Sequence, residues 1–455
     1  MNVRLTPLEP WIAATIGAGG PGLDRTQLQR YQLARLRSTV QLTRERAPFY
    51  RNLLRDLPIG PDTLQDVARY PFTTAADLAA HGPRMVCVSQ DDVTRVVTIQ
   101  EQQEKQEQPE HLAALDTSGT TGTPKRLWFT GSDQELTIDF FRAGMSTFTD
   151  PGDRVLVLLP CERPGGVGDL LATALERLGA RPIRHGVVQD VDATLALLHE
   201  HRPDVAVGIP AQVLALARRG PGLRLKAVLL STDHVPLSLT RTVEQAWGCR
   251  VFNHYGMTET GLGGGVECEA RRGYHLREAD LYVEIVEPDG ALPVPDGEPG
   301  EVVVTTLTRT GMPLIRYRTG DLSRFIPGPC PCGSTLRALE RITRRAAGVV
   351  RTSTGAGLTL AELDEVLFGL PDVLDFDATL RRGTTGDTLE LDVRVAAGPG
   401  APRLAPDTVA AAVNVIPALA PGSPGGAVGA RIIVRPATAV AAPAKRRMKV
   451  VDRDA

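Results

Sequence analysis

The sequence has almost no net charge and no long apolar run. Lysine and arginine number 51 against 53 aspartate and glutamate residues, a formal net charge of -2 over 455 residues. This balance gives no strong field of one sign, so it argues against nucleic acid or an anionic membrane as a partner. No apolar run reaches the roughly eighteen residues of a membrane span, and the first residues lack the charged-then-apolar order of a signal peptide. We therefore expect a cytoplasmic protein.

Cysteine is also scarce, with six residues in the whole chain. That number is too small for a disulfide scaffold in a chain of this size. Cys268 and His275 are followed much later by Cys330 and Cys332. Three thiols and one imidazole satisfy a tetrahedral Zn²⁺ site, which would be closed and therefore structural. The alternative is that these are buried cysteines packed as small apolar side chains, with a histidine bonded to the backbone.

A dozen residues at 115–126, LDTSGTTGTPKR, are too polar to pack in a core. Glycine lets backbone N–H groups approach a polyphosphate, hydroxyl groups donate hydrogen bonds, and lysine supplies a mobile positive charge. The GxxxxGK[ST] spacing of a Walker A loop is absent. The stretch predicts either a triphosphate-binding loop or a flexible polar linker. The candidate nucleotide ligands in it are Thr117, Ser118, Gly119, Thr120, Thr121, Gly122 and Lys125.

Strand-like and helix-like segments take turns after this stretch. Apolar runs typical of buried strands lie at 154–159, 204–209 and 226–230, and each is followed by a segment with helical periodicity, at 168–178, 211–218 and 239–247. This alternation predicts an α/β fold with parallel sheets covered by helices on both faces. The length predicts roughly two to four domains.

Two further motifs follow in chain order. The segment 253–261, NHYGMTETG, comes directly after a short apolar strand, so it is a strand-end loop of the kind that gathers ligands in α/β sheets. The segment 317–322, YRTGDL, follows another apolar run. Together with the hydroxyl-rich stretch, and in this order, they resemble the adenylate-forming enzymes, the superfamily of acyl-CoA synthetases. The resemblance is closest to the phenylacetate–CoA ligase branch and covers most of the chain from near residue 30.

The resemblance implies roles for single residues. Glu259 would hold Mg²⁺, a hard cation that prefers oxygen ligands, and Thr258 would hydrogen-bond the α-phosphate. Tyr255 would lie against the adenine, and Asp321 would accept hydrogen bonds from the ribose hydroxyls. The implied nucleotide site also contains Gly256, Met257 and Arg345.

The resemblance also implies a domain division. A large N-terminal domain, 1–343, would contain parallel and mixed sheets flanked by helices, and a small mobile α+β domain, 344–455, would follow. The family hinge has an acidic pair after its Gly-Arg. Here 341–348, RITRRAAG, keeps arginine without that pair, which puts the hinge residue, and through it the second half-reaction, in doubt. The catalytic lysine of the C-terminal domain is predicted as Lys445, with Lys449 as the alternative. Read alone, this basic tail is a solvated terminus.

The predicted acyl pocket combines glycines with aromatic side chains, a shape that suits a flat aryl acid, although a small polar acid is the alternative. Its predicted residues are Phe141, Met145, Gly166, Ser231, Asp233 and Gly261.

Three functions compete. The leading one is ATP-dependent activation of a carboxylic acid to an acyl-adenylate and transfer to CoA, with Mg²⁺ and structural Zn²⁺ as metals. The second keeps adenylation but transfers the acyl group to a carrier protein, an amine or another nucleophile. The third is a non-catalytic protein that binds nucleotide and zinc. The sequence allows a homodimer.

Overall fold

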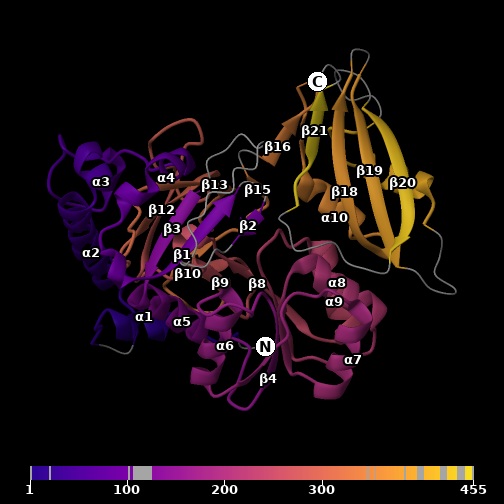
Figure 1. Cartoon of the computed structure of the whole chain (residues 1–455), viewed down its shortest axis with the longest axis horizontal. Helices are drawn as coiled ribbons and strands as arrows, with labels where there is room; N and C mark the ends of the chain where they lie inside the picture. Colours follow the sequence, from indigo (N-terminus) through magenta and orange to yellow (C-terminus); the bar gives the residue numbers. More distant parts are fainter. Residues whose placement is uncertain are drawn as a thin grey trace. The chain divides into compact units, whose positions relative to one another are not determined.

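The computed structural model describes residues 3–19, 22–100, 103–105, 125–345, 348–353, 355–383, 386–396, 404–420, 428–437 and 446–452. The chain forms two compact units (Figure 1). The first unit consists of Met1–Asp150, Arg163–Gly179 and His254–Arg341, and the second consists of Pro151–Glu162, Ala180–Asn253 and Ile342–Ala455. The domain division at residue 343 stays a prediction.

The second unit contains a parallel sheet with the strand order β5-β4-β6-β7-β8. Its strands are β4 (Arg154–Leu158), β5 (Arg181–Arg184), β6 (Val205–Gly208), β7 (Ala227–Leu230) and β8 (Arg250–Tyr255). The connecting helices are α7 (Val191–His201), α8 (Pro210–Arg219) and α9 (Leu237–Trp247). All four residues of both β6 and β7 are buried, as in a sheet covered on both faces. The predicted α/β fold is confirmed.

The C-terminal part of this unit is an α+β arrangement. Its sheet has the order β20-β19-β18-β21, in which β18 and β19 are antiparallel and both outer pairs are parallel. The elements are β15 (Arg344–Arg345), β16 (Val349–Arg351), β17 (Gly357–Thr359), α10 (Leu360–Leu367), β18 (Val373–Arg382), β19 (Thr388–Ala396), α11 (Pro406–Val413), β20 (Gly429–Ala437) and β21 (Lys449–Asp452). One hydrophobic core joins Leu214 of α8 and Trp247 of α9 with Leu363 of α10 and Phe376 of β18. Buried apolar area therefore stabilises this part against the helices of the parallel sheet.

The first unit contains several α-helices. They are α1 (Leu8–Thr15), α2 (Arg25–Arg46), α3 (Pro48–Leu53), α4 (Ala75–His81), α5 (Gly131–Met145) and α6 (Val167–Leu178). Asp24 caps α2 by accepting from the Thr26 amide. The helix ends at Arg46 because Pro48 disfavours helical geometry in the preceding residue, Ala47, and Pro48 then occupies the first turn of α3.

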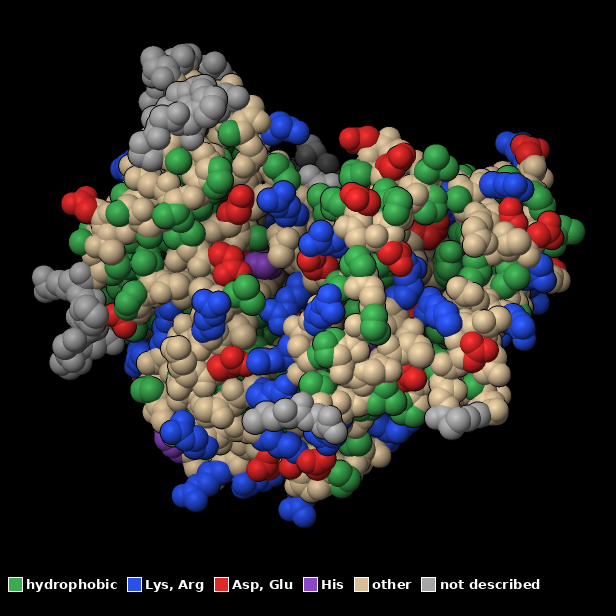
Figure 2. Space-filling model, turned by 180° about the vertical axis from the view of Figure 1, so that it is seen from behind, with side chains coloured by type: hydrophobic (Ala, Val, Ile, Leu, Met, Phe, Trp, Pro, Cys, Tyr) green, Lys and Arg blue, Asp and Glu red, His purple; other side chains and the backbone are tan. Residues whose placement is uncertain are grey.

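Two small sheets and a short antiparallel extension of β8 complete the first unit. Strand β1 (Val93–Gln100) lies between β2 (Gln103–Lys105) and β3 (Lys125–Thr130), and β12 (Gly300–Thr306) lies between β11 (Leu281–Val286) and β13 (Tyr317–Ser323). The last two residues of β8 pair with β9 (Gly265–Glu267), which is followed by β10 (Tyr274–Leu276) and β14 (Ala338–Leu339). Basic and acidic side chains are both spread over the face drawn in Figure 2, in keeping with the small net charge. In the described part of the chain, no helix has the length and hydrophobicity of a membrane span.

Candidate functional site

Lys125, near the end of the stretch predicted to bind phosphate, contacts Glu259, the acid predicted to bind Mg²⁺. The loop residues 117–122 lie outside the described part of the chain, and Lys125, which opens β3, is the first described residue after them. Its Nζ lies 3.3 Å from Oε1 of Glu259, which sits on the single 3₁₀ turn Thr258–Thr260 just after β8. The two side chains are 21% and 8% exposed. Two residues predicted separately therefore form one partly buried ion pair.

Glu259 has two further partners that the sequence did not reveal. The Tyr317 hydroxyl donates to the same Oε1 at 3.0 Å, and Arg309 donates to the Glu259 carbonyl at 3.0 Å. Arg309 also donates to the carbonyl of Trp128 on β3 at 3.2 Å, and its guanidinium lies 4.2 Å from the centre of the Phe129 ring. Burial lowers the pKa of Arg309 to about 10, so it keeps its charge at neutral pH. The side chain and the main chain of Glu259 are thus both held.

The residues predicted for the adenosine end of the nucleotide also meet. Tyr255, the last residue of β8, donates through its hydroxyl to Oδ2 of Asp321 on β13 at 3.0 Å. Both residues are buried, and the Tyr255 ring stacks on Tyr274 with centroids 5.6 Å apart. The predicted roles toward adenine and ribose stay predictions, as do those of Thr258, Gly256 and Met257. The structure adds that the side chains of Tyr255 and Asp321 are hydrogen-bonded to each other.

The predicted acyl-pocket residues belong to both units. Phe141 and Met145 are buried on α5, Gly166 immediately precedes α6, and the carbonyl of Gly261 accepts from Thr137 at 2.8 Å. Ser231 and Asp233 follow β7 in the second unit, and Arg345, which was predicted for the nucleotide site, lies on β15 in the same unit. The assignment of these residues stays a prediction.

His254 is a half-buried neutral base beside Phe141 that the sequence did not single out. Its ring centroid lies 6.0 Å from those of both Phe140 and Phe141. Burial, and then the positive charge of Arg277, lower the pKa of His254 to about 4. The imidazole is therefore uncharged at neutral pH and adds no fixed charge to this apolar region of α5.

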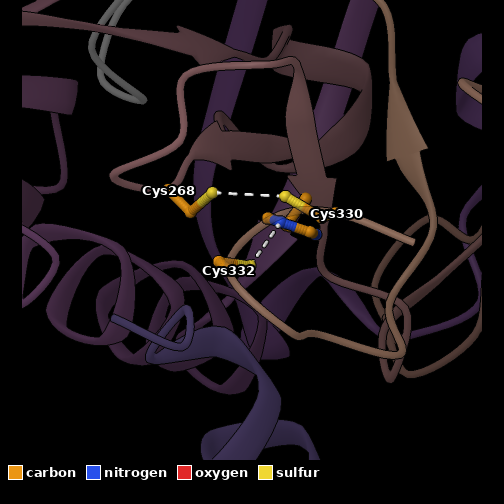
Figure 3. Close-up of side chains that lie close together, drawn as sticks. Cys268, Cys330 and Cys332 are labelled. Atoms are coloured by element: carbon orange, nitrogen blue, oxygen red, sulfur yellow. Dashed lines mark hydrogen bonds between the residues drawn. The ribbon is translucent and has the colours of Figure 1, made fainter. Parts of the chain in front are cut away.

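The four predicted zinc ligands converge. Cys268, His275, Cys330 and Cys332 are buried, and their ligand atoms all lie within 4.8 Å of one another (Figure 3). The two Sγ atoms of Cys268 and Cys330 are 3.6 Å apart, and Cys332 Sγ is 3.4 Å from His275 Nε2. A tetrahedral site with metal–sulfur bonds of about 2.3 Å has edges of roughly 3.7 Å, so the donor set fits such an ion. Hydrogen bonds from Cys268 and Cys330 hold the pKa of Cys332 well below its usual value, which favours a thiolate there.

Buried carboxylates brace both ends of this cluster. Glu9 of α1 accepts from the hydroxyl of Ser334 at 2.6 Å and from the amide of Thr335 at 2.7 Å, just after Cys332. Glu267, fully buried next to Cys268, pairs with Arg341 at 2.7 Å. The loops that carry the thiols are therefore fixed by contacts that do not depend on the cluster itself.

The C-terminal tail is anchored through Arg446, next to the predicted catalytic residue. Lys445 lies outside the described residues, whereas Lys449, the alternative, is exposed on β21. Arg446 pairs with Asp364 at 2.8 Å and with Asp233 at 3.3 Å, all within the second unit. Burial raises the pKa of Asp364 to about 7. The predicted acyl-pocket residue Asp233 is thus a partner of the tail.

A protein-family model described as AMP-binding enzyme matches residues 30–308 of the chain. The match contains the hydroxyl-rich stretch and the Glu259 loop.

Curated relatives cover most of the chain. It is 30% identical over 387 residues to a phenylacetate-coenzyme A ligase of Thermus thermophilus, a match spanning 80% of this chain and 81% of the relative. It is 29% identical to the phenylacetate-coenzyme A ligase of Escherichia coli, over 70% of this chain and 71% of that one. Among solved structures, a 2-hydroxyisobutyryl-CoA ligase in complex with 2-HIB-AMP superimposes with a TM-score of 0.76 and 22% identity, covering 95% of this chain and 91% of that chain. The last similarity concerns the fold alone.

Proposed function

Because this chain belongs to the AMP-binding enzyme family of adenylate-forming enzymes, on its phenylacetate–CoA ligase-like branch, we propose that it is an ATP-dependent acid–thiol ligase. It activates a carboxylic acid to an acyl-adenylate and transfers the acyl group to CoA, giving acyl-CoA, AMP and pyrophosphate. The observation that carries the proposal is the Lys125–Glu259 ion pair, because it brings the end of the hydroxyl-rich loop to the acid of the strand-end motif.

In the first half-reaction the substrate carboxylate attacks the α-phosphorus of ATP, and pyrophosphate leaves with the bonding electron pair. Negative charge builds up on the phosphoryl oxygens, so the site must supply positive charge and hydrogen-bond donors. Glu259 would hold Mg²⁺, which when bound neutralises part of that charge. Lys125 supplies a mobile cation at the end of the loop, and Thr258 supplies a hydroxyl. Lys445 is proposed as the catalytic lysine.

In the second half-reaction the thiolate of CoA attacks the acyl carbonyl and AMP leaves. Tyr255 and Asp321 would hold the adenosine throughout, since their contact already fixes the two side chains together. Phenylacetate, the acid in the names of the curated relatives, makes an aryl acid the first substrate class to test.

A different acyl acceptor is the second candidate, and the hinge segment favours it. The acidic pair of the family is absent at 341–348, and Arg341 is engaged by the buried Glu267. A carrier protein or an amine would then take the acyl group in place of CoA. Release of AMP without formation of a CoA thioester would favour this reading.

We also propose that Cys268, His275, Cys330 and Cys332 hold a structural Zn²⁺. Four protein ligands close the coordination sphere, so the ion would stabilise the fold and take no part in the reaction. Glu9 and Arg341 would keep the ligand loops in place. A cytoplasmic location stays a prediction.

The test is ATP–pyrophosphate exchange with a panel of aromatic and aliphatic acids, each measured with and without CoA. Exchange that depends on one acid, and a thioester that forms only when CoA is present, support the ligase. If no acid in a broad panel supports exchange, the proposal fails.

A further inference from the structure

Strand β13 meets the strand-end loop at two points. Tyr317 donates to Glu259 at 3.0 Å, and Asp321 accepts from Tyr255 at 3.0 Å. In each segment the two contacting residues are four positions apart. Their order is reversed between the segments, so the two segments run in opposite directions, with one hydrogen bond at each end. The contacts therefore join β13 to the loop at separate places.

The local structure of β13 explains how both side chains reach the loop. Tyr317, Thr319 and Asp321 are buried, whereas the residues between them are partly exposed. The pairing with β12 shifts register between Glu301 and Val303, which indicates a bulge opposite these residues. Gly320 takes a left-handed φ of 74° there. A bulge redirects side chains locally, and this one lies beside Asp321.

The contacts of Glu259 differ in whether they persist when nucleotide binds. Lys125 and Tyr317 donate to the same oxygen, Oε1. Under the proposed function Lys125 turns to the phosphates, so its contact with Glu259 is given up. Tyr317 cannot follow, because its ring is 3% exposed and packed in the apolar cluster that includes Tyr50 and Leu127.

We propose that Tyr317 is a positioning residue that holds the carboxylate of Glu259 in the orientation that binds Mg²⁺, while Asp321 on the same strand holds the ribose. This inference rests on the proposed function and deepens it: β13 sets the distance between the adenosine and metal ends of the nucleotide. Arg309, through the Glu259 carbonyl, fixes the main chain at the same place. Hydrogen bonds to a metal-binding carboxylate orient it, and their loss costs about 10- to 100-fold in metal affinity.

The test compares two tyrosine variants of the full-length chain. Tyr317→Phe removes only the hydroxyl that contacts Glu259. Tyr50→Phe is the matched control, because Tyr50 is fully buried in the same cluster and its hydroxyl bonds Thr73 and the Ile315 amide instead. The measurement is the increase in melting temperature caused by ATP as a function of Mg²⁺ concentration, which requires neither an acid nor turnover.

We expect the Mg²⁺ midpoint of Tyr317→Phe to rise about ten-fold, with the full effect of ATP recovered at high Mg²⁺. Tyr50→Phe should melt at a lower temperature with an unchanged Mg²⁺ midpoint. An equal midpoint in Tyr317→Phe and the unmodified chain, or equal shifts in both variants, overturns the inference and leaves the proposed function intact. If ATP gives no Mg²⁺-dependent stabilisation even in the unmodified chain, both are overturned.

Discussion

Replacing Glu259 by glutamine removes the charge that pairs with Lys125 and keeps the size of the side chain. In the unmodified chain, ATP without Mg²⁺ must draw Lys125 away and leave Glu259 without that cation. The ion pair, at 3.3 Å, attracts by about 5 kcal/mol at an effective dielectric constant of about 20. Breaking a buried pair costs on the order of 3–5 kcal/mol, and the partial exposure of Lys125 reduces this to roughly 1–3 kcal/mol. That energy corresponds to about 5- to 150-fold in ATP affinity.

The effect of Glu259→Gln on ATP affinity is expected to have opposite signs with and without Mg²⁺. In EDTA, Glu259→Gln binds ATP more tightly than the unmodified chain, because no ion pair has to be broken. With saturating Mg²⁺ it binds ATP more weakly, because the metal has lost its carboxylate. Isothermal titration calorimetry under both conditions measures the ratio of the ATP affinities of the variant and the unmodified chain.

A control variant separates this effect from general destabilisation. Glu278→Gln breaks another partly buried ion pair of the first unit, with Arg25 at 2.5 Å, and should leave the ATP affinity unchanged under both conditions. If Glu259→Gln binds ATP in EDTA no more tightly than the unmodified chain, Lys125 does not leave Glu259 to bind the nucleotide, and the reasoning is refuted.

Three further predictions concern the metal cluster, the second unit and the adenosine end. Cys330→Ser should lose bound zinc by elemental analysis and melt several degrees lower, whereas Cys249→Ser, a buried thiol outside the cluster, should keep its zinc; equal zinc in both contradicts the site. Burial raises the pKa of Asp364 from 3.8 to about 7, so the folded state keeps a proton that the unfolded state loses, and stability should fall as pH rises from about 4 to 7, by at most about 1.4 kcal/mol per pH unit. Urea unfolding at pH 5 and 7 should show that the free energy of unfolding changes less with pH in Asp364→Asn than in the unmodified chain. An identical change with pH would exclude Asp364 as its cause. Tyr255→Phe removes the hydrogen bond to Asp321 and should weaken ATP binding about ten-fold at unchanged maximal exchange, whereas a loss confined to the maximal rate would contradict a binding role.

The regular elements were largely predictable because their signals are local. The helix predicted at 239–247 lies within α9, Leu237–Trp247, and the strand predicted at 226–230 is β7, Ala227–Leu230. Thr359 and Glu362 form a capping box that defines the start of α10 in the sequence. By contrast, β5 was not predicted, since its four residues, RPIR, carry two exposed arginines and little apolar pattern.

The site was predictable only where residues lie in motifs. Glu259 and Asp321 belong to such motifs, and the structure places each beside another motif residue. Arg309 lies outside the motifs, and its contacts are with chain segments distant in sequence. His254 lies inside the 253–261 motif, yet its packing against Phe140 and Phe141 also depends on a segment distant in sequence. Tyr317 was inside a recognised motif, yet its contact with Glu259 depends on the pairing and bulge of β13, which the sequence alone does not specify.

The most direct test of the central claim is acid-dependent ATP–pyrophosphate exchange by the unmodified chain and by Glu259→Ala. The account predicts exchange with at least one aryl acid and its loss, by about 100-fold or more, in the variant. Mg²⁺-dependent binding of ATP without exchange for any acid would contradict it, because the chain would then bind the nucleotide without activating a carboxylate.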